Sequence, residues 1–336
     1  MSLPHQYIDR RSGAVKEEKL FGDRLVRWLY SPLREQVPWL FRALTGPRLS
    51  HLLAWYQYDA ALASRVAGNR RFLLACGVDF EECLEPPEAL DTARKVFERQ
   101  IRYWQCRPAV ADRATVLSPA DARMLIGSFA DRQPLFLKEK FFCFEELLGN
   151  RPEWHKTFAE GDFAVFRLTP DKYHYNHVPV SGTVLNFYEI DGDYHSCNPA
   201  AIVRQVTPFS KNRRVVTIID SDVPEGSGVG KVAMIEVVAM MIGQIVQCYS
   251  AHRYDNPQRL KPGMFLRAGA PKSLYRPGSS TDVLIFEPGR IAFADDLQAN
   301  QLRSDVYSRF ASGFGKPLVE TEVQVRSPIA RAASVF

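Results

Sequence analysis

The spacing of apolar residues changes along this chain, from a helical pattern before Pro108 to a β-strand pattern after it. In the first part, the three- and four-residue spacing of an amphipathic helix joins Leu49, Leu52, Leu53, Tyr56 and Ala60. This part is divided into short segments by Pro32, Pro38 and Pro47. Another helix is predicted within 85–104, where good helix formers follow two prolines. We therefore expect residues 1–107 to be mainly helical.

After Pro108 the pattern becomes that of short β-strands. Runs rich in Val, Ile and Phe are separated by clusters of Gly, Pro, Asn and Asp. They predict strands at 163–168, 182–190, 213–220, 232–249, 264–268 and 283–287. Because strands and helices do not alternate regularly, a parallel sheet with crossover helices is not expected. The pattern predicts an α+β protein with short amphipathic helices first, a β-rich domain over 108–325, and a disordered tail over 326–336.

The composition is that of a globular protein, with 46% apolar and 24% charged residues among 336. Its six cysteines show no metal-binding spacing, so we expect a reducing compartment and no structural metal. The N-terminus has no apolar signal segment. The longest apolar run, 232–246, contains Glu236 and is short for a membrane span. These features favour a cytoplasmic protein that does not cross a membrane.

The net charge of +5 is concentrated in one segment. Residues 20–71 hold eight arginines against three acidic residues, together with many Trp, Tyr, Phe and Leu residues. Arginines and aromatics on short amphipathic helices suit the surface of an anionic membrane. The alternative is that the aromatics belong to the core and the arginines face water, and both interpretations stay open here. Nucleic acid is a weaker candidate partner, because the basic residues form no recognisable binding motif.

Three polar stretches carry candidate chemistry. The segment TPDKYHYNHVPVSG places His174 and His177 three residues apart after a predicted strand, and LSPADAR places Asp121 in a proline-containing turn. A third stretch, PGSS, comes directly before the apolar strand at 283–287. Taken singly, each stretch has an ordinary structural explanation, such as a turn closed by local hydrogen bonds.

Taken together, these stretches resemble the phosphatidylserine decarboxylase family. The family motifs have their counterparts in SPADA (118–122), PDKYHYNHVP (170–179) and GSSTDVLIFEPGRI (278–291). Further agreement is found in YIDRRSGAVKEEKL near the start, GDYHSCNP (192–199) and IEVVAMMIGQIVQCY (235–249). The likeness covers nearly the whole chain and keeps the order of the motifs.

The resemblance implies a self-processing enzyme. In this family a serine attacks the preceding carbonyl, the chain is cut, and the serine becomes a pyruvoyl group that binds the substrate amine and accepts electrons during decarboxylation. Asp121 and His177 match the family's triad positions, in which an oriented histidine takes the serine proton. His174 matches the residue that handles the substrate and the later proton transfer.

Several departures from the family pattern affect this interpretation. The usual Gly-Ser-Thr is replaced by Gly278-Ser279-Ser280-Thr281. A gapless match to the strand makes Ser280 the pyruvoyl precursor, whereas a literal Gly-Ser bond makes it Ser279. Ala122 also replaces the glycine after the motif's aspartate. Tyr175 replaces an arginine between the two histidines, so a planar cation that could hold a carboxylate or phosphate is absent there.

Three hypotheses follow. The first is a decarboxylase of phosphatidylserine at the cytoplasmic face of the membrane, which the basic aromatic segment favours. The second is a pyruvoyl decarboxylase of a soluble amino acid, which the missing arginine favours. The third is an uncleaved, inactive relative that serves as a binding protein. A homodimer is a candidate assembly, since dimers are the commonest oligomers.

Overall fold

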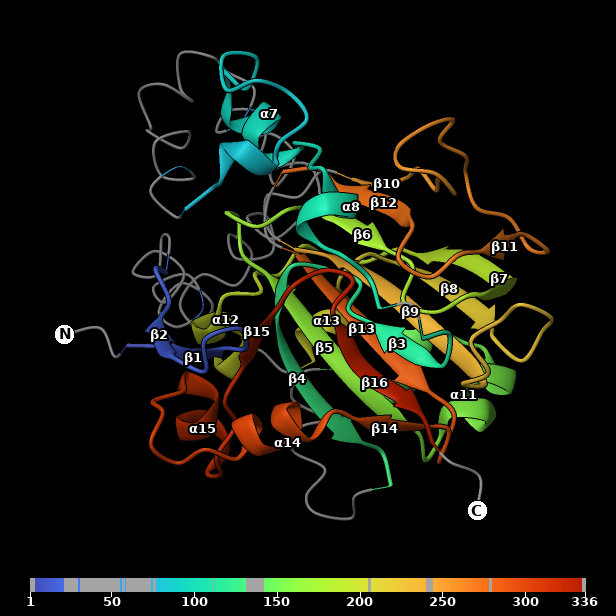
Figure 1. The fold of residues 1–336 in the computed structure, drawn as a ribbon. Helices are drawn as coiled ribbons and strands as arrows, with labels where there is room; N and C mark the ends of the chain where they lie inside the picture. The colour runs from blue at the N-terminus through green and yellow to red at the C-terminus, as the bar shows by residue number, and fades with distance from the viewer. Residues whose placement is uncertain are drawn as a thin grey trace.

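The computed structural model describes residues 4–20, 30, 55, 58, 74, 77–110, 112–130, 142–204, 207–239, 244–277 and 280–333. A ten-stranded sheet dominates them, flanked by two three-stranded sheets (Figure 1). From one edge to the other, its strands are β11 (Phe265–Leu266), β7 (Gly182–Ile190), β8 (Arg214–Asp220), β9 (Lys231–Val238), β13 (Ser280–Phe286), β5 (Asp162–Leu168), β4 (Ala122–Ser128), β15 (Thr321–Val323), β1 (Gln6–Asp9) and β2 (Val15–Glu17).

The two smaller sheets come from segments far apart in the chain. One has the order β10 (Ile245–Gln247), β12 (Pro271–Tyr275) and β6 (Tyr175–His177). The other has the order β14 (Ile291–Phe293), β16 (Pro328–Ala332) and β3 (Thr115–Leu117). Short helices complete the described fold: η3 (Phe80–Glu82), α7 (Ala93–Phe97), α8 (Tyr103–Cys106), α10 (Phe144–Leu148), α11 (Pro152–Phe158), α12 (Pro199–Arg204), α13 (Pro208–Lys211), α14 (Asp295–Gln301) and α15 (Arg309–Phe314).

Strand β13 lies in the middle of the large sheet and is buried on both faces. Its Leu284 and Phe286 belong to one apolar core, and its Val283 and Ile285 belong to a second core on the opposite face. A strand covered on both faces needs apolar residues at consecutive positions, which explains why this segment is a continuous apolar run and does not alternate.

The α+β class is confirmed, and most of the predicted strands are present. The prediction of one strand over 232–249 is wrong, because β9 and β10 belong to different sheets. The helix predicted within 85–104 is reduced to the short helices α7 and α8.

Two boundary predictions are also wrong. Within the region expected to be helical, residues 6–17 form β1 and β2, and β1 buries Ile8 and pairs with β15 in parallel. Within the tail expected to be disordered, β16 pairs with β14 and β3 and buries Ile329. In both places long-range pairing orders a segment whose local pattern is weak.

The amphipathic helices predicted over 20–71 lie outside the described residues, apart from three aromatic positions. Tyr30 and Tyr58 are buried, and the Tyr30 hydroxyl accepts a hydrogen bond from the backbone N–H of Ser196 (2.7 Å). Trp55 is 56% exposed. The core interpretation therefore holds for the two tyrosines, while contact with a membrane stays a prediction. None of the helices in the described ranges is long and apolar enough to cross a membrane.

Candidate active site

Ser280 opens the central strand of the large sheet. It lies opposite Leu168 of β5 on one side and Val238 of β9 on the other, and it is completely buried. Its hydroxyl Oγ has no hydrogen-bond partner among the described residues. A buried hydroxyl without a partner is uncommon in folded proteins and marks a position where another group is expected. Gly278 and Ser279, the other two residues of the predicted cleavage motif, lie outside the described residues.

His177 ends β6, and its imidazole is held at both nitrogens. Nδ1 lies 2.9 Å from the carbonyl oxygen of Gly269, which can only accept, so Nδ1 carries the proton. Nε2 therefore accepts from the hydroxyl of Tyr173, 3.0 Å away, and that hydroxyl lies 2.7 Å from the hydroxyl of Tyr254. Burial lowers the pKa of His177 to about 3. The ring is thus neutral, with its lone pair on Nε2, which is the form that a general base requires.

Asp121 lies in the turn before β4 and is paired with an arginine. Arg107 donates from Nε to Oδ1 (3.2 Å) and from Nη2 to Oδ2 (3.0 Å), and the backbone N–H of Val325 donates to Oδ1 (2.7 Å). Burial opposes ionisation of this carboxyl, but Arg107 outweighs it and lowers the pKa. The backbone N–H of His177 donates to the carbonyl of Pro119 (2.7 Å), which keeps the turn beside the histidine. The side chain of His177 is nevertheless oriented by Gly269 and not by Asp121.

His174 comes directly before β6 and presents an unoccupied imidazole. The ring is completely buried and stacks on Phe97, with 3.5 Å between ring centroids. Neither nitrogen has a hydrogen-bond partner within the described ranges. Burial, assisted by the charge of Arg99, lowers the pKa of His174 well below its usual value. A neutral imidazole with two unpaired nitrogens is suited to exchange a proton with a bound molecule.

A buried polar network that the sequence analysis missed lies two residues beyond Ser280. Asp282 of β13 faces Glu236 of β9 across the sheet, on the same side as Ser280. Glu236 accepts from Lys272 Nζ (2.6 Å), and all three side chains are fully buried. Burial and the neighbouring Glu236 raise the pKa of Asp282 well above its usual value, which favours the neutral form of this carboxyl. One indication of this network is present in the sequence, because Asp282, Glu236 and Lys272 are charged residues within segments that form buried strands.

Tyr275 at the end of β12 connects this network to His174. Its backbone N–H donates to the carbonyl oxygen of His174 (3.0 Å). Its hydroxyl lies 2.7 Å from Oδ1 of Asp282 and 3.1 Å from the carbonyl oxygen of Thr281. Tyr275 thus links the histidine segment, through its backbone, to the first residues of β13, through its hydroxyl.

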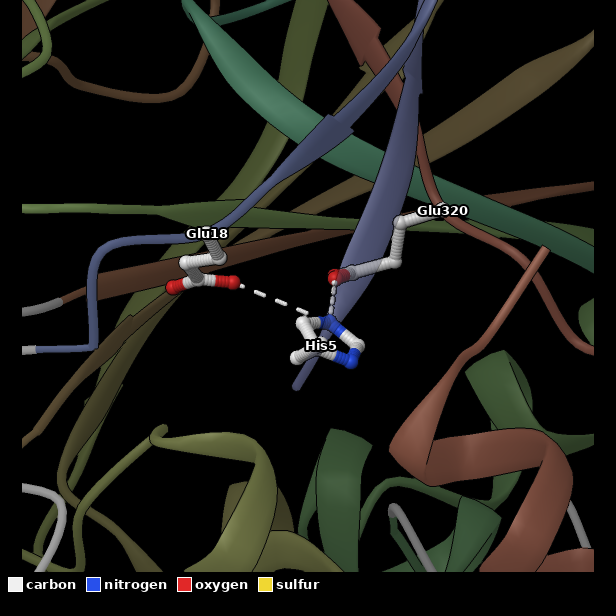
Figure 2. A group of neighbouring side chains, drawn as sticks. All are labelled: His5, Glu18 and Glu320. Carbon is white, nitrogen blue, oxygen red and sulfur yellow. Dashed lines mark hydrogen bonds and ion pairs between the residues drawn. The ribbon is translucent and has the colours of Figure 1, made fainter. Parts of the chain in front are cut away.

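A second buried charge cluster contains His5, Glu18 and Glu320, drawn in Figure 2. His5 Nε2 lies 2.8 Å from Glu320 and 3.6 Å from Glu18. Two carboxylates and a histidine could bind a metal ion, but Arg167 contacts both carboxylates at 2.6 Å and already supplies positive charge. Burial opposes ionisation of Glu320, yet Arg167 lowers its pKa to about 2. We therefore interpret the cluster as an ion-pair network that ties the N-terminal segment to β5 and β15.

Comparison with known proteins finds similar proteins of one family. The family model described as phosphatidylserine decarboxylase matches residues 93–314. A relative named phosphatidylserine decarboxylase proenzyme from Chlamydia trachomatis is 29% identical over 297 residues, which cover 87% of this chain and 90% of the relative. Relatives with the same name from Fusobacterium nucleatum (27% identical, 88% and 91% covered) and Bordetella petrii (31% identical, 67% and 79% covered) are also similar.

Proposed function

Because the chain belongs to the phosphatidylserine decarboxylase family, we propose that it converts phosphatidylserine to phosphatidylethanolamine and carbon dioxide after cutting itself before Ser280. The observation that carries this proposal is the Ser280 hydroxyl, which is fully buried and unpartnered at the start of the central strand. His177 lies on the small sheet and His174 directly precedes it, and Tyr275 of that sheet contacts the same strand as Ser280.

Self-cleavage begins when Ser280 Oγ attacks the carbonyl carbon of residue 279. The amide C–N bond breaks as its nitrogen takes a proton, which leaves an ester. Loss of the Cα proton of residue 280 then expels the carboxylate of residue 279, and water hydrolyses the resulting dehydroalanine to a pyruvoyl group and ammonia. This sequence consumes one water molecule and needs a base for the hydroxyl proton.

His177 is the proposed base. Its tautomer is fixed by the Gly269 carbonyl, so the accepting lone pair is on Nε2, where Tyr173 now donates. The Tyr173 hydroxyl can donate to Tyr254 instead, 2.7 Å away, which frees Nε2 to take the serine proton. Asp121 contributes through its negative charge and through its turn, which the His177 backbone holds.

The residues around Ser280 also fit a pyruvoyl group at that position. The hydroxyl is buried and has no partner among the described residues, and Asp282, whose pKa is raised, lies two residues further on the same face of β13. Tyr275 links the segment of His174 to this strand, since its backbone N–H donates to the His174 carbonyl and its hydroxyl contacts Asp282. When present, the pyruvoyl group supplies an electron sink for the carbon–carbon bond that releases carbon dioxide. His174 then returns a proton to the carbon that has lost the carboxylate.

A lipid substrate implies that the enzyme acts at a membrane surface. We assign that contact to the arginine- and aromatic-rich segment 20–71, on the cytoplasmic face, with a homodimer as the candidate assembly. Flotation with vesicles containing phosphatidylserine tests the membrane contact. Recovery of the protein only in the vesicle-free fraction of the gradient, while it decarboxylates a soluble amino acid, would favour the soluble substrate.

The mass of the purified chain tests self-cleavage. Cleavage before Ser280 yields a small fragment of residues 280–336 whose pyruvoyl end resists Edman sequencing and is labelled by an amine with borohydride. Ser280→Ala should block maturation, whereas the matched Ser279→Ala, which keeps a small residue before the nucleophile, should only slow it. The reverse pattern would move the precursor to Ser279. A single intact chain from the unmodified protein would favour the inactive relative.

A further inference from the structure

A cavity of about 660 Å³ lies between the large sheet and the small sheet that carries β10 and β12. The large sheet contributes Phe187, Val215 and Val238 to its walls, and β10 contributes Ile245 and Gln247. This volume is in the range of small-molecule sites in proteins. In Figure 1 the same two sheets lie beside each other around β8, β9 and β10.

The cavity begins one strand away from the predicted cleavage site. Val238 lines it and also lies directly opposite Ser280 in the sheet. On its other side, the Val238 backbone N–H donates to the carbonyl oxygen of Arg213 (3.0 Å). Three neighbouring segments therefore place Ser280, Val238 and Arg213 in one row across the sheet. Two strand spacings separate the ends of this row, so the Cα atoms of Ser280 and Arg213 lie about 10 Å apart.

Arginine is the main charged residue of the lining. Arg213, Arg259 and Arg276 line the cavity, and Glu189 is the one acidic residue among the described residues on its walls. Arg213 donates to Glu189 (2.8 Å), but both side chains are partly exposed, and such pairs exchange partners at little cost. Within the described part of the chain, the Arg276 side chain makes two long contacts, 3.9 Å to Glu98 and 3.4 Å to Gln244.

We propose that this cavity binds the phosphodiester of the lipid substrate through Arg213, Arg259 and Arg276, a role that rests on the proposed function. In phosphatidylserine only Cα, Cβ and one ester oxygen separate the reacting amine from the phosphorus atom. An amine held at residue 280 thus brings the phosphate to the near wall of the cavity. Guanidinium groups bind phosphate oxygens in pairs of charge-assisted hydrogen bonds. The apolar residues beyond them, Phe187, Ile245 and Leu260, face the glycerol and the first acyl carbons.

A phosphate site in this cavity explains how the chain can do without a cation at Tyr175, the position at which the family has an arginine. Tyr175 is buried, and its hydroxyl accepts a hydrogen bond from Gln100 (3.1 Å). It supplies no charge for the substrate. The cavity arginines provide the cation for the phosphate from a different part of the fold.

The test is direct binding of dihexanoyl phosphatidylglycerol, which has a phosphodiester but no amine, below its micelle-forming concentration. Calorimetry on the full chain should show that Arg259→Gln weakens binding about tenfold, because one charge-assisted interaction is lost. Arg276→Gln should act similarly. The matched control is Arg331→Gln at an exposed position of β16, which should bind like the unmodified protein. With dihexanoyl phosphatidylserine, Arg259→Gln should raise KM and keep kcat.

The outcomes separate this inference from the proposed function. Unchanged lipid binding in Arg259→Gln and Arg276→Gln would overturn the phosphodiester site even if the protein decarboxylates phosphatidylserine. Inorganic phosphate that binds as tightly as the lipid would overturn it too. An unmodified chain that neither cleaves nor decarboxylates, but binds the lipid through Arg259, would overturn the proposed function and support the site.

Discussion

Replacing His177 by glutamine tests the protonation state of the proposed base. Glutamine keeps the two hydrogen bonds of the ring, since its amide can donate to the Gly269 carbonyl and its oxygen can accept from Tyr173. It cannot act as a general base near neutral pH. His177→Gln should therefore fold normally and remain an uncut chain.

The expected effect on stability follows from the pKa of the buried ring. The pKa of His177 is about 3 in the folded protein, against an ordinary value of 6.5. Above pH 6.5 neither state binds the proton, and the full stability is present. As the pH falls from 6.5 toward 3, only the unfolded chain binds the proton, so folded stability is lost by up to about 1.4 kcal/mol per pH unit. The loss due to His177 should reach about 2 kcal/mol at pH 5.

The assay compares urea unfolding at pH 7.5 and pH 5 in a Ser280→Ala background, which keeps every chain uncut. His177→Gln should lose about 2 kcal/mol less than the parent between these pH values. The control is His252→Gln, which removes a histidine whose side chain is 73% exposed and leaves the buried ring of His177 in place. Equal losses in His177→Gln and the parent would refute the neutral, buried ring. Cleavage of His177→Gln in the Ser280 background would remove His177 from the role of base.

Three further predictions follow from the site and the sheet. His174→Gln should permit chain cleavage but suppress carbon dioxide release, measured with labelled substrate; a normal rate would mean that the wrong histidine is assigned. Lys272→Met should lower the free energy of unfolding by about 3–5 kcal/mol, because it leaves Glu236 charged and buried, and adding Glu236→Gln should recover much of the loss. Equal stability of the single and double variants, measured in urea, would contradict the buried ion pair. After cleavage, the fragment 280–336 should co-elute with the larger fragment in native size-exclusion chromatography and separate only in denaturant.

The large sheet could be predicted from sequence because its central strands are buried on both faces. The segments of β5 and β8 are short runs of β-branched and aromatic residues between turn signals, and their predicted bounds match within one residue. The prediction for β13 found the apolar run, but the strand begins three residues earlier, at Ser280. A charged residue inside such an apolar run indicates a buried partner, and this information was not used in the sequence analysis. Glu236 was read as an argument against a membrane span, whereas its burial beside Lys272 also implies a partner on another strand.

The hydrogen bonds of the site could not be predicted, because they join positions far apart in the chain. The motifs suggested that Asp121 orients His177, but Arg107 contacts the carboxylate and the Gly269 carbonyl contacts the ring. A backbone carbonyl has no sequence signature, so no motif could have shown it. The first strands, over 6–17, were missed for a related reason, since their order depends on pairing with β15 near the other end of the chain.

The position of Ser280 also bears on how the proposed cut inside the core can leave the chain folded. The proposed cut falls just before β13, whose backbone is paired with β5 on one side and β9 on the other. The small fragment also contains β15, which pairs with β1 and β4, and β16, which pairs with β3. Each of these three strands therefore remains hydrogen-bonded to the large fragment, and all seven residues of β13 remain buried. Breaking one peptide bond removes none of these strand pairs, so the new end at residue 280 stays beside the residues that formed it.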